Sequence, residues 1–211
     1  MIVPDLTPYI KKFQALRPYL LKCESIKETR KLLNKEFKNI KWNLLKKSGE
    51  IDKDGNIVEV IQAYFDVSHL RILIDCGEAF YKYICDEEEI DRLIKITLSM
   101  IGHELIHEAQ YNRRQQALLY YKAGKRKDYL SRPEELTAYG WQIAQELRDY
   151  GLNREEAIEI IKIDVEVASI ITSALGMYLL TFKKIERPYK KLIKTVVAYL
   201  ETSNEQIPQL S

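Results

Sequence analysis

His103, Glu104 and His107 stand in the pentapeptide His-Glu-Leu-Ile-His, whose spacing suits the binding of one metal ion. An α-helix repeats every ~3.6 residues, so side chains four positions apart project from one face and both imidazoles can reach the same ion. A glutamate directly after the first histidine can reach a water molecule at an open coordination position. The pentapeptide therefore predicts zinc-assisted hydrolysis with Glu104 as general base. The alternative is a pair of core histidines, each hydrogen-bonded to a neighbour.

Zinc in such a site takes a third protein ligand, and the histidine content limits its type. The chain has three histidines; His69 lies upstream in a predicted strand region, and none follows His107. We therefore expect a carboxylate on a following helix, with a cysteine as the less favoured choice.

Two adjacent glutamates offer this carboxylate. Ser131 and Glu134 have the spacing of a capping box, and Pro133 suits the first turn of a helix. In that arrangement Glu134 reaches back to the amide of Ser131, which leaves Glu135 to bind the metal. Glu135 is therefore the predicted ligand, and Glu134 is the alternative.

The pentapeptide lies within a long predicted helix. Asp86 and Glu89 form a capping pattern. Apolar or small residues then recur at three- and four-residue spacing, as on a buried stripe: Ile90, Leu93, Ile94, Thr97, Leu98, Ile101, Leu105 and Ala109. The helix is expected from about residue 87 to about 115, with Lys122 as its furthest extent.

The remaining chain reads as helices, then strands, then helices. Helices are expected over 7–21, 25–37, 153–175 and 185–202, and strands over 57–67 and 70–75, joined tightly by Ser68 and His69. Residues 49–56 are rich in turn formers but do not match a calcium-binding loop. The tail, residues 203–211, is expected to fray. The fold class is thus α+β and mostly helical, in segments 1–48, 49–150 and 151–211 that form one compact unit.

Residues 167–182 carry no charge. A membrane span needs about 20 apolar residues, so no span is predicted, and a central buried helix behind the active site is favoured over an interfacial segment.

Composition indicates a soluble intracellular protein. The net charge of +2 gives no electrostatic case for nucleic acid. The first residues lack the pattern of a secretory signal, so a cytoplasmic location is expected, or a virion if the gene belongs to a phage. Cys23, Cys76 and Cys85 are expected to be free buried thiols.

The order of these motifs resembles a known group. His103-Glu104-x-x-His107 followed by Glu135-Leu136-Thr137-Ala138 on a capped helix is similar to the gluzincins, zinc peptidases whose third ligand is glutamate. The ExxA form is similar to phage-associated metallopeptidase-like proteins and, more distantly, to the IrrE/ImmA group. The resemblance covers about residues 57–148. It implies a zincin-like fold, with a sheet of about two or three strands packed on the HExxH helix.

Two functions follow as expectations. A zinc peptidase would act on a peptide or protein, with its oxyanion stabilised by Tyr111, Tyr139, Arg113 or Arg114, and with the substrate paired to the edge of the strand before the long helix. The alternative is a catalytically inactive zincin-fold protein with a structural or regulatory role in a phage or mobile element. The presence of Glu104 favours the enzyme. Oligomeric state and cleavage preference stay open.

Overall fold

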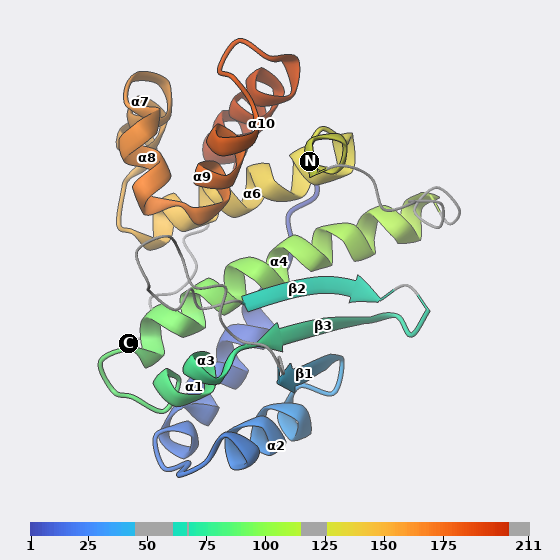
Figure 1. Cartoon of the computed structure of the whole chain (residues 1–211), viewed down its shortest axis with the longest axis vertical. Helices are drawn as coiled ribbons and strands as arrows, with labels where there is room; N and C mark the ends of the chain where they lie inside the picture. Colours follow the sequence, from blue (N-terminus) through green and yellow to red (C-terminus); the bar gives the residue numbers. More distant parts are fainter. Residues whose placement is uncertain (45–60, 67, 115–125, 203–211) are drawn as a thin grey trace. The chain divides into compact units, whose positions relative to one another are not determined.

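The computed structural model describes residues 1–44, 61–66, 68–114 and 126–202. Their fold is α+β and mostly helical with one small mixed sheet, as the sequence predicts. Two compact units divide the chain: the sheet unit contains Asp5–Glu104, and the helical unit contains Met1–Pro4 and the described residues from Leu105 onward. One helix, α4 (Ile90–Arg114), is continuous through this division (Figure 1). The organisation into segments 1–48, 49–150 and 151–211 stays a prediction.

Two helices open the sheet unit, as predicted: α1 (Thr7–Leu20) and α2 (Ile26–Glu36). Ser25 caps α2, because its side chain accepts a hydrogen bond from the backbone N–H of Glu28. After the sheet comes a short helix, α3 (Glu78–Tyr83).

The sheet has three strands in the order β1-β3-β2: β1 (Ile40–Leu44), β2 (Ile61–Asp66) and β3 (Arg71–Cys76). β2 and β3 pair antiparallel, which confirms the two predicted strands over their described residues, whereas residues 57–60 and 67 of the first lie outside that part of the chain. Ser68 and His69 lie in the turn between the two strands. β1 pairs parallel with β3 and was not predicted. The expectation that a substrate pairs with the strand before the long helix is wrong, because β3 is already paired on both sides (Figure 1).

Aromatic side chains form the core beside β1. The ring of Trp42 lies 5.9 Å from Phe37 and 6.1 Å from Phe80, and Phe13 lies 4.6 Å from Phe37. All four rings are buried. Helix α1, the end of α2, strand β1 and helix α3 thus share one apolar cluster, which packs them together as a unit.

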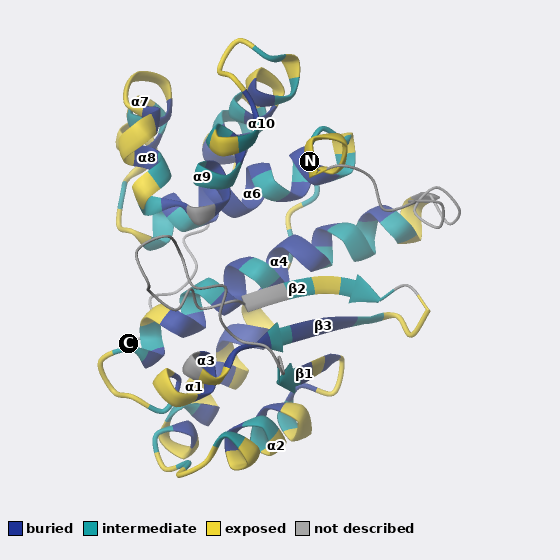
Figure 2. Ribbon diagram, viewed as in Figure 1, coloured by how far each residue is buried: buried dark blue, intermediate teal, exposed yellow. Residues whose placement is uncertain are grey.

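The long helix begins later than predicted. α4 starts at Ile90, because the Asp86 carboxylate accepts a hydrogen bond from Glu88 N–H and caps a turn in front of the helix. The apolar stripe is buried as far as Ile101, whereas Leu105 and Ala109 are half-buried (Figure 2). An extension of this helix to Lys122 lies outside the described residues.

Six helices of the helical unit follow α4 within the described residues: α5 (Arg126–Leu130), α6 (Pro133–Asp149), α7 (Arg154–Ile163), α8 (Val165–Ile171), α9 (Ser173–Thr181) and α10 (Arg187–Thr202). The last of them confirms the predicted helix over 185–202. α6 and α10 pack very closely where Gly140 meets Thr195.

The single helix predicted over 153–175 is wrong. Asn153 does open a helix, through a capping box with Glu156, but α7 ends at Ile163. The carboxylate of Asp164 then accepts a hydrogen bond from Val167 N–H and starts α8. A second break at Thr172, between α8 and α9, divides residues 167–182, so they do not form one central buried helix.

The surface of this segment also differs from expectation. Ile170 and Leu180 are 85% and 89% exposed. No helix within the described residues is long and apolar enough to cross a membrane. The predicted turn-rich segment 49–56 and the tail 203–211 lie outside the described residues.

The three cysteines are free thiols, as predicted. Only Cys76 is buried, and burial raises the pKa of its thiol. Cys23 and Cys85 are half-buried, so the expectation of burial is wrong for these two.

Candidate metal centre

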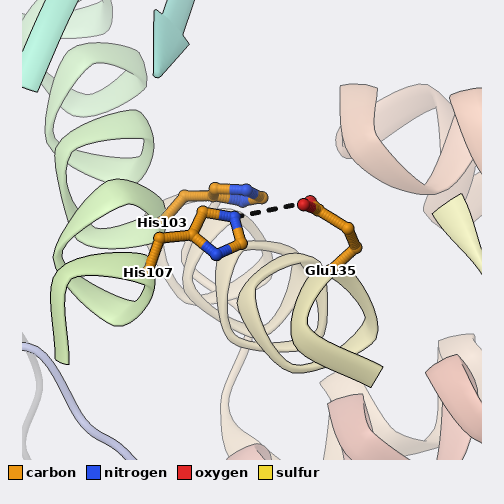
Figure 3. A group of neighbouring side chains, drawn as sticks. All are labelled: His103, His107 and Glu135. Carbon is orange, nitrogen blue, oxygen red and sulfur yellow. Dashed lines mark ion pairs between the residues drawn. The ribbon is translucent and has the colours of Figure 1, made fainter. Parts of the chain in front are cut away.

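Three predicted ligands lie together. His103 and His107 stand one turn apart on α4, and Glu135 stands in the first turn of α6 (Figure 3). One ligand atom from each of the three lies within 4.8 Å of the others. His103 and Glu135 are 5% and 7% exposed, so two of the three polar side chains are buried. Two imidazole nitrogens and one carboxylate oxygen form a donor set that can hold a metal ion.

The distance between His107 and Glu135 can be compared with the spacing of two ligands around one zinc ion. The Nε2 atom of His107 lies 3.4 Å from Oε2 of Glu135 (Figure 3). Zinc binds histidine nitrogen at about 2.0–2.1 Å and carboxylate oxygen at about 2.0–2.2 Å, so two ligand atoms of a tetrahedral site lie roughly 3.3 Å apart. The observed separation therefore suits two ligands of one such ion.

Gln110 supports the position of His107 and was missed by the sequence analysis. It lies three residues after His107 on α4 and is buried. Its Oε1 lies 3.0 Å from Nδ1 of His107, and its Nε2 donates to the backbone oxygen of Glu134 at 3.3 Å. The spacing of three residues, which places both side chains on one helix face, was the available signal.

The start of α6 corrects one prediction. Arg132 is the N-cap residue, and its side chain makes no capping hydrogen bond to the start of α6. The hydroxyl of Ser131 instead donates to the backbone oxygen of Asp128 at 2.9 Å. The capping box of Ser131 and Glu134 is therefore wrong, although Pro133 is the first helical residue as predicted.

Helix geometry nevertheless gives the side chains of Glu134 and Glu135 different directions. Adjacent residues on a helix point about 100° apart, so Glu134 and Glu135 face different directions. Glu135 belongs to the metal-binding group, whereas Glu134 is half-buried and contributes a backbone oxygen to Gln110.

Glu104, the predicted general base, is buried on α4 directly after His103, with 5% of its surface exposed. A carboxylate is costly to bury, so its position inside the protein beside a candidate ligand is consistent with a role in chemistry. His69 lies elsewhere: its Nδ1 is 2.7 Å from Asp66 Oδ2 in the turn between β2 and β3.

The two tyrosines proposed to stabilise the oxyanion occupy equivalent positions relative to the proposed ligands. Tyr111 follows His107 by one turn, and Tyr139 follows Glu135 by one turn. Both are half-buried. Of the two arginine candidates, Arg113 is exposed, and the side chain of Arg114 lies outside the described set.

Tyr178 is a further neighbour that the sequence analysis missed. Its ring meets that of Tyr139 edge to face at 5.5 Å, and its hydroxyl donates to the backbone oxygen of Leu130 at 2.9 Å. Burial, followed by the charges of Tyr139 and Glu135, raises the pKa of Tyr178. The phenol therefore stays neutral and packs against Tyr139, four residues after Glu135 on α6. No sequence spacing signals this residue, because only tertiary packing brings α9 to α6.

No family model, curated protein or solved structure matches the chain. The candidate centre is therefore judged on its own residues and their geometry.

Proposed function

We propose that the protein is a zinc-dependent metallopeptidase of the gluzincin type, with a zincin-like fold and a peptide or protein as substrate. The observation that carries this proposal is the group of His103, His107 and Glu135, whose ligand atoms lie within 4.8 Å of one another. The buried side chain of Glu104, the residue directly after His103, supports an enzyme, because a purely structural metal site has no use for an additional acid.

His103, His107 and Glu135 would hold the ion. A bound zinc ion would act as a Lewis acid, which polarises the substrate carbonyl and lowers the pKa of a water molecule. Glu104 accepts one proton from the attacking water at its carboxylate and passes it to the nitrogen of the leaving amine. The water oxygen joins the carbonyl carbon, the carbon–nitrogen bond breaks, and one carboxylic acid and one amine are released.

Two tyrosines are the candidates for stabilising the developing negative charge on the carbonyl oxygen. A phenol hydroxyl can donate a hydrogen bond to that oxygen, as oxyanion donors do. Tyr111 and Tyr139 each lie one turn past a proposed ligand, so each belongs to the same helix face as that ligand. The hydroxyl of Tyr178 donates to Leu130, which makes Tyr178 less suited to this role.

The substrate would have to bind differently from the sequence-based expectation. Since β3 is the central strand, an extended peptide could add to the sheet only at β1 or β2 among the described strands. Main-chain hydrogen bonds of that kind tolerate many side chains, so cleavage preference would depend on side-chain contacts.

Metal analysis of the purified protein tests the proposal. We expect about one equivalent of zinc in the wild type and in His69→Ala, and its loss in His103→Ala. The His69→Ala variant is the matched control, because His69 lies in a turn of the sheet and pairs with Asp66. A wild type that binds no zinc from a buffered solution would overturn the proposed centre.

Hydrolysis is then measured with a protein substrate such as casein and with a library of quenched fluorescent peptides. Glu104→Gln should retain zinc and lose hydrolysis, because a carboxamide does not accept the proton. Zinc binding without turnover by the wild type on any of these substrates would favour the inactive structural or regulatory protein.

A further inference from the structure

We propose that Gln110 is a positioning residue, which fixes the tautomer of His107 so that its Nε2 atom faces the metal. This inference rests on the proposed metal centre and adds a residue to it. Gln110 contacts a ligand on one side and the residue before another ligand on the other, so it acts through both of them.

The orientation of the Gln110 amide follows from its contact with Glu134. A backbone carbonyl is only an acceptor, so the group of Gln110 that faces the oxygen of Glu134 must be the amide NH₂. The opposite side of the amide, Oε1, then faces His107 at 3.0 Å. Gln110 is 8% exposed, which leaves little room for water to take either place.

The amide orientation of Gln110 in turn determines the tautomer of the His107 imidazole. Because Oε1 of Gln110 is only an acceptor, Nδ1 of His107 must carry the hydrogen and donate it. In the neutral ring Nε2 then holds a lone pair, and a metal ligand needs that lone pair. The same Nε2 atom lies 3.4 Å from Oε2 of Glu135, at the candidate centre. Hydrogen bonds that orient ligating histidines in this way strongly affect metal affinity.

Gln110 also contacts the start of α6. The hydrogen bond to Glu134 ties α4 to the first turn of α6, directly before Glu135. One buried amide thus fixes the ring of one proposed ligand and the backbone next to another. Its loss should loosen both ligands at once.

Three variants test this role. Gln110→Met removes both hydrogen bonds at similar volume, whereas Gln110→Glu keeps an acceptor for Nδ1 of His107 and loses the donor to Glu134. Gln145→Met is the matched control, because Gln145 is also buried, on α6, and its amide donates to Asp149 at 2.9 Å.

Zinc and cobalt affinities are measured by titration against a competing chelator. We expect Gln110→Met to bind either metal about 10–100-fold more weakly, Gln110→Glu to recover the part of this loss that comes from His107, and Gln145→Met to match the wild type. Wild-type affinity in Gln110→Met would overturn the proposal, and so would an equal loss in Gln145→Met.

The tautomer is read directly from long-range proton–nitrogen NMR spectra of the metal-free protein, at a pH where the ring is neutral. The wild type and Gln110→Glu should show His107 protonated at Nδ1, and Gln110→Met should show the Nε2–H form in substantial population. A wild type protonated at Nε2 would overturn the inference. If the wild type bound no zinc, the proposed function would fail, but these spectra would still decide the role of Gln110.

Discussion

Glu134 and Glu135 are adjacent in the sequence but take different parts at the start of α6. The carboxylate of Glu135 lies 3.4 Å from Nε2 of His107, whereas Glu134 accepts a hydrogen bond from Gln110 through its backbone oxygen. A helix turns about 100° between neighbouring residues, so the two side chains cannot exchange roles without rotation of the helix.

The first prediction concerns these two side chains. Glu135→Ala should weaken zinc binding by orders of magnitude, because the carboxylate ligand is removed. Glu134→Ala should leave the affinity nearly unchanged, because the backbone oxygen that holds Gln110 remains. Zinc titration of both variants measures the difference. Weakened binding in Glu134→Ala together with wild-type binding in Glu135→Ala would reverse the assignment.

The second prediction compares two helix starts that look alike in the sequence. Asn153→Ala should destabilise the protein by about 1 kcal/mol, because Asn153 and Glu156 form a complete capping box. Ser131→Ala should change stability by less than about 0.5 kcal/mol, because Ser131 does not cap the start of α6. Urea denaturation measures both changes. A larger loss in Ser131→Ala than in Asn153→Ala would contradict the capping assignments.

The contrast between these two starts shows what local sequence rules can predict. Ser131 satisfies the spacing rule, but its hydroxyl is engaged by the oxygen of Asp128 at the end of α5. The helix α5 was not predicted from the sequence, so this competing hydrogen bond was not predicted either. The choice of Glu135 over Glu134 agrees with the metal-binding group, but the physical reason is helix rotation and not the capping box.

The periodic signal located the long helix α4, but it did not reveal β1 or the break before α8. The stripe from Ile90 to Ile101 located α4, because many buried positions repeat the same spacing. β1 has five residues, and its partner β3 lies far along the chain, so no local pattern defines it. The break at Asp164 was missed because the apolar pattern continues through it.

Close packing of α6 against α10 gives the third prediction. A Cβ atom added at Gly140 would lie 2.5 Å from Cγ2 and 3.0 Å from Cβ of Thr195. Gly140→Ala should therefore destabilise the protein by about 1–3 kcal/mol through overpacking, even though alanine favours helices. Gly176→Ala is the control, because a Cβ atom added there would lie 3.4 Å from its nearest neighbour, the backbone oxygen of Ser169. Denaturation midpoints compare the two variants.

A second substitution separates the steric cause from other effects. Thr195→Ser removes the closest atom, so the double variant Gly140→Ala, Thr195→Ser should lose less stability than the two single changes predict in sum. Additive losses would mean that Gly140 is required for another reason.

The last prediction concerns acid and the turn between β2 and β3. Hydrogen bonds from the Ser68 hydroxyl and from His69 lower the pKa of Asp66 from 3.8 to about 2. Because the folded pKa lies below the unfolded value, the carboxylate stabilises the turn above pH 4, and this contribution is lost as the pH falls toward about 2. Asp66→Asn should therefore be less stable than the wild type at neutral pH, and the difference in stability should disappear over this acid range.

NMR titration of the Asp66 carboxyl carbon measures the pKa directly. Ser68→Ala removes the hydrogen bond that contributes most to the low pKa of Asp66, so that pKa should rise toward its ordinary value. An unchanged pKa would contradict the role of the Ser68 hydroxyl.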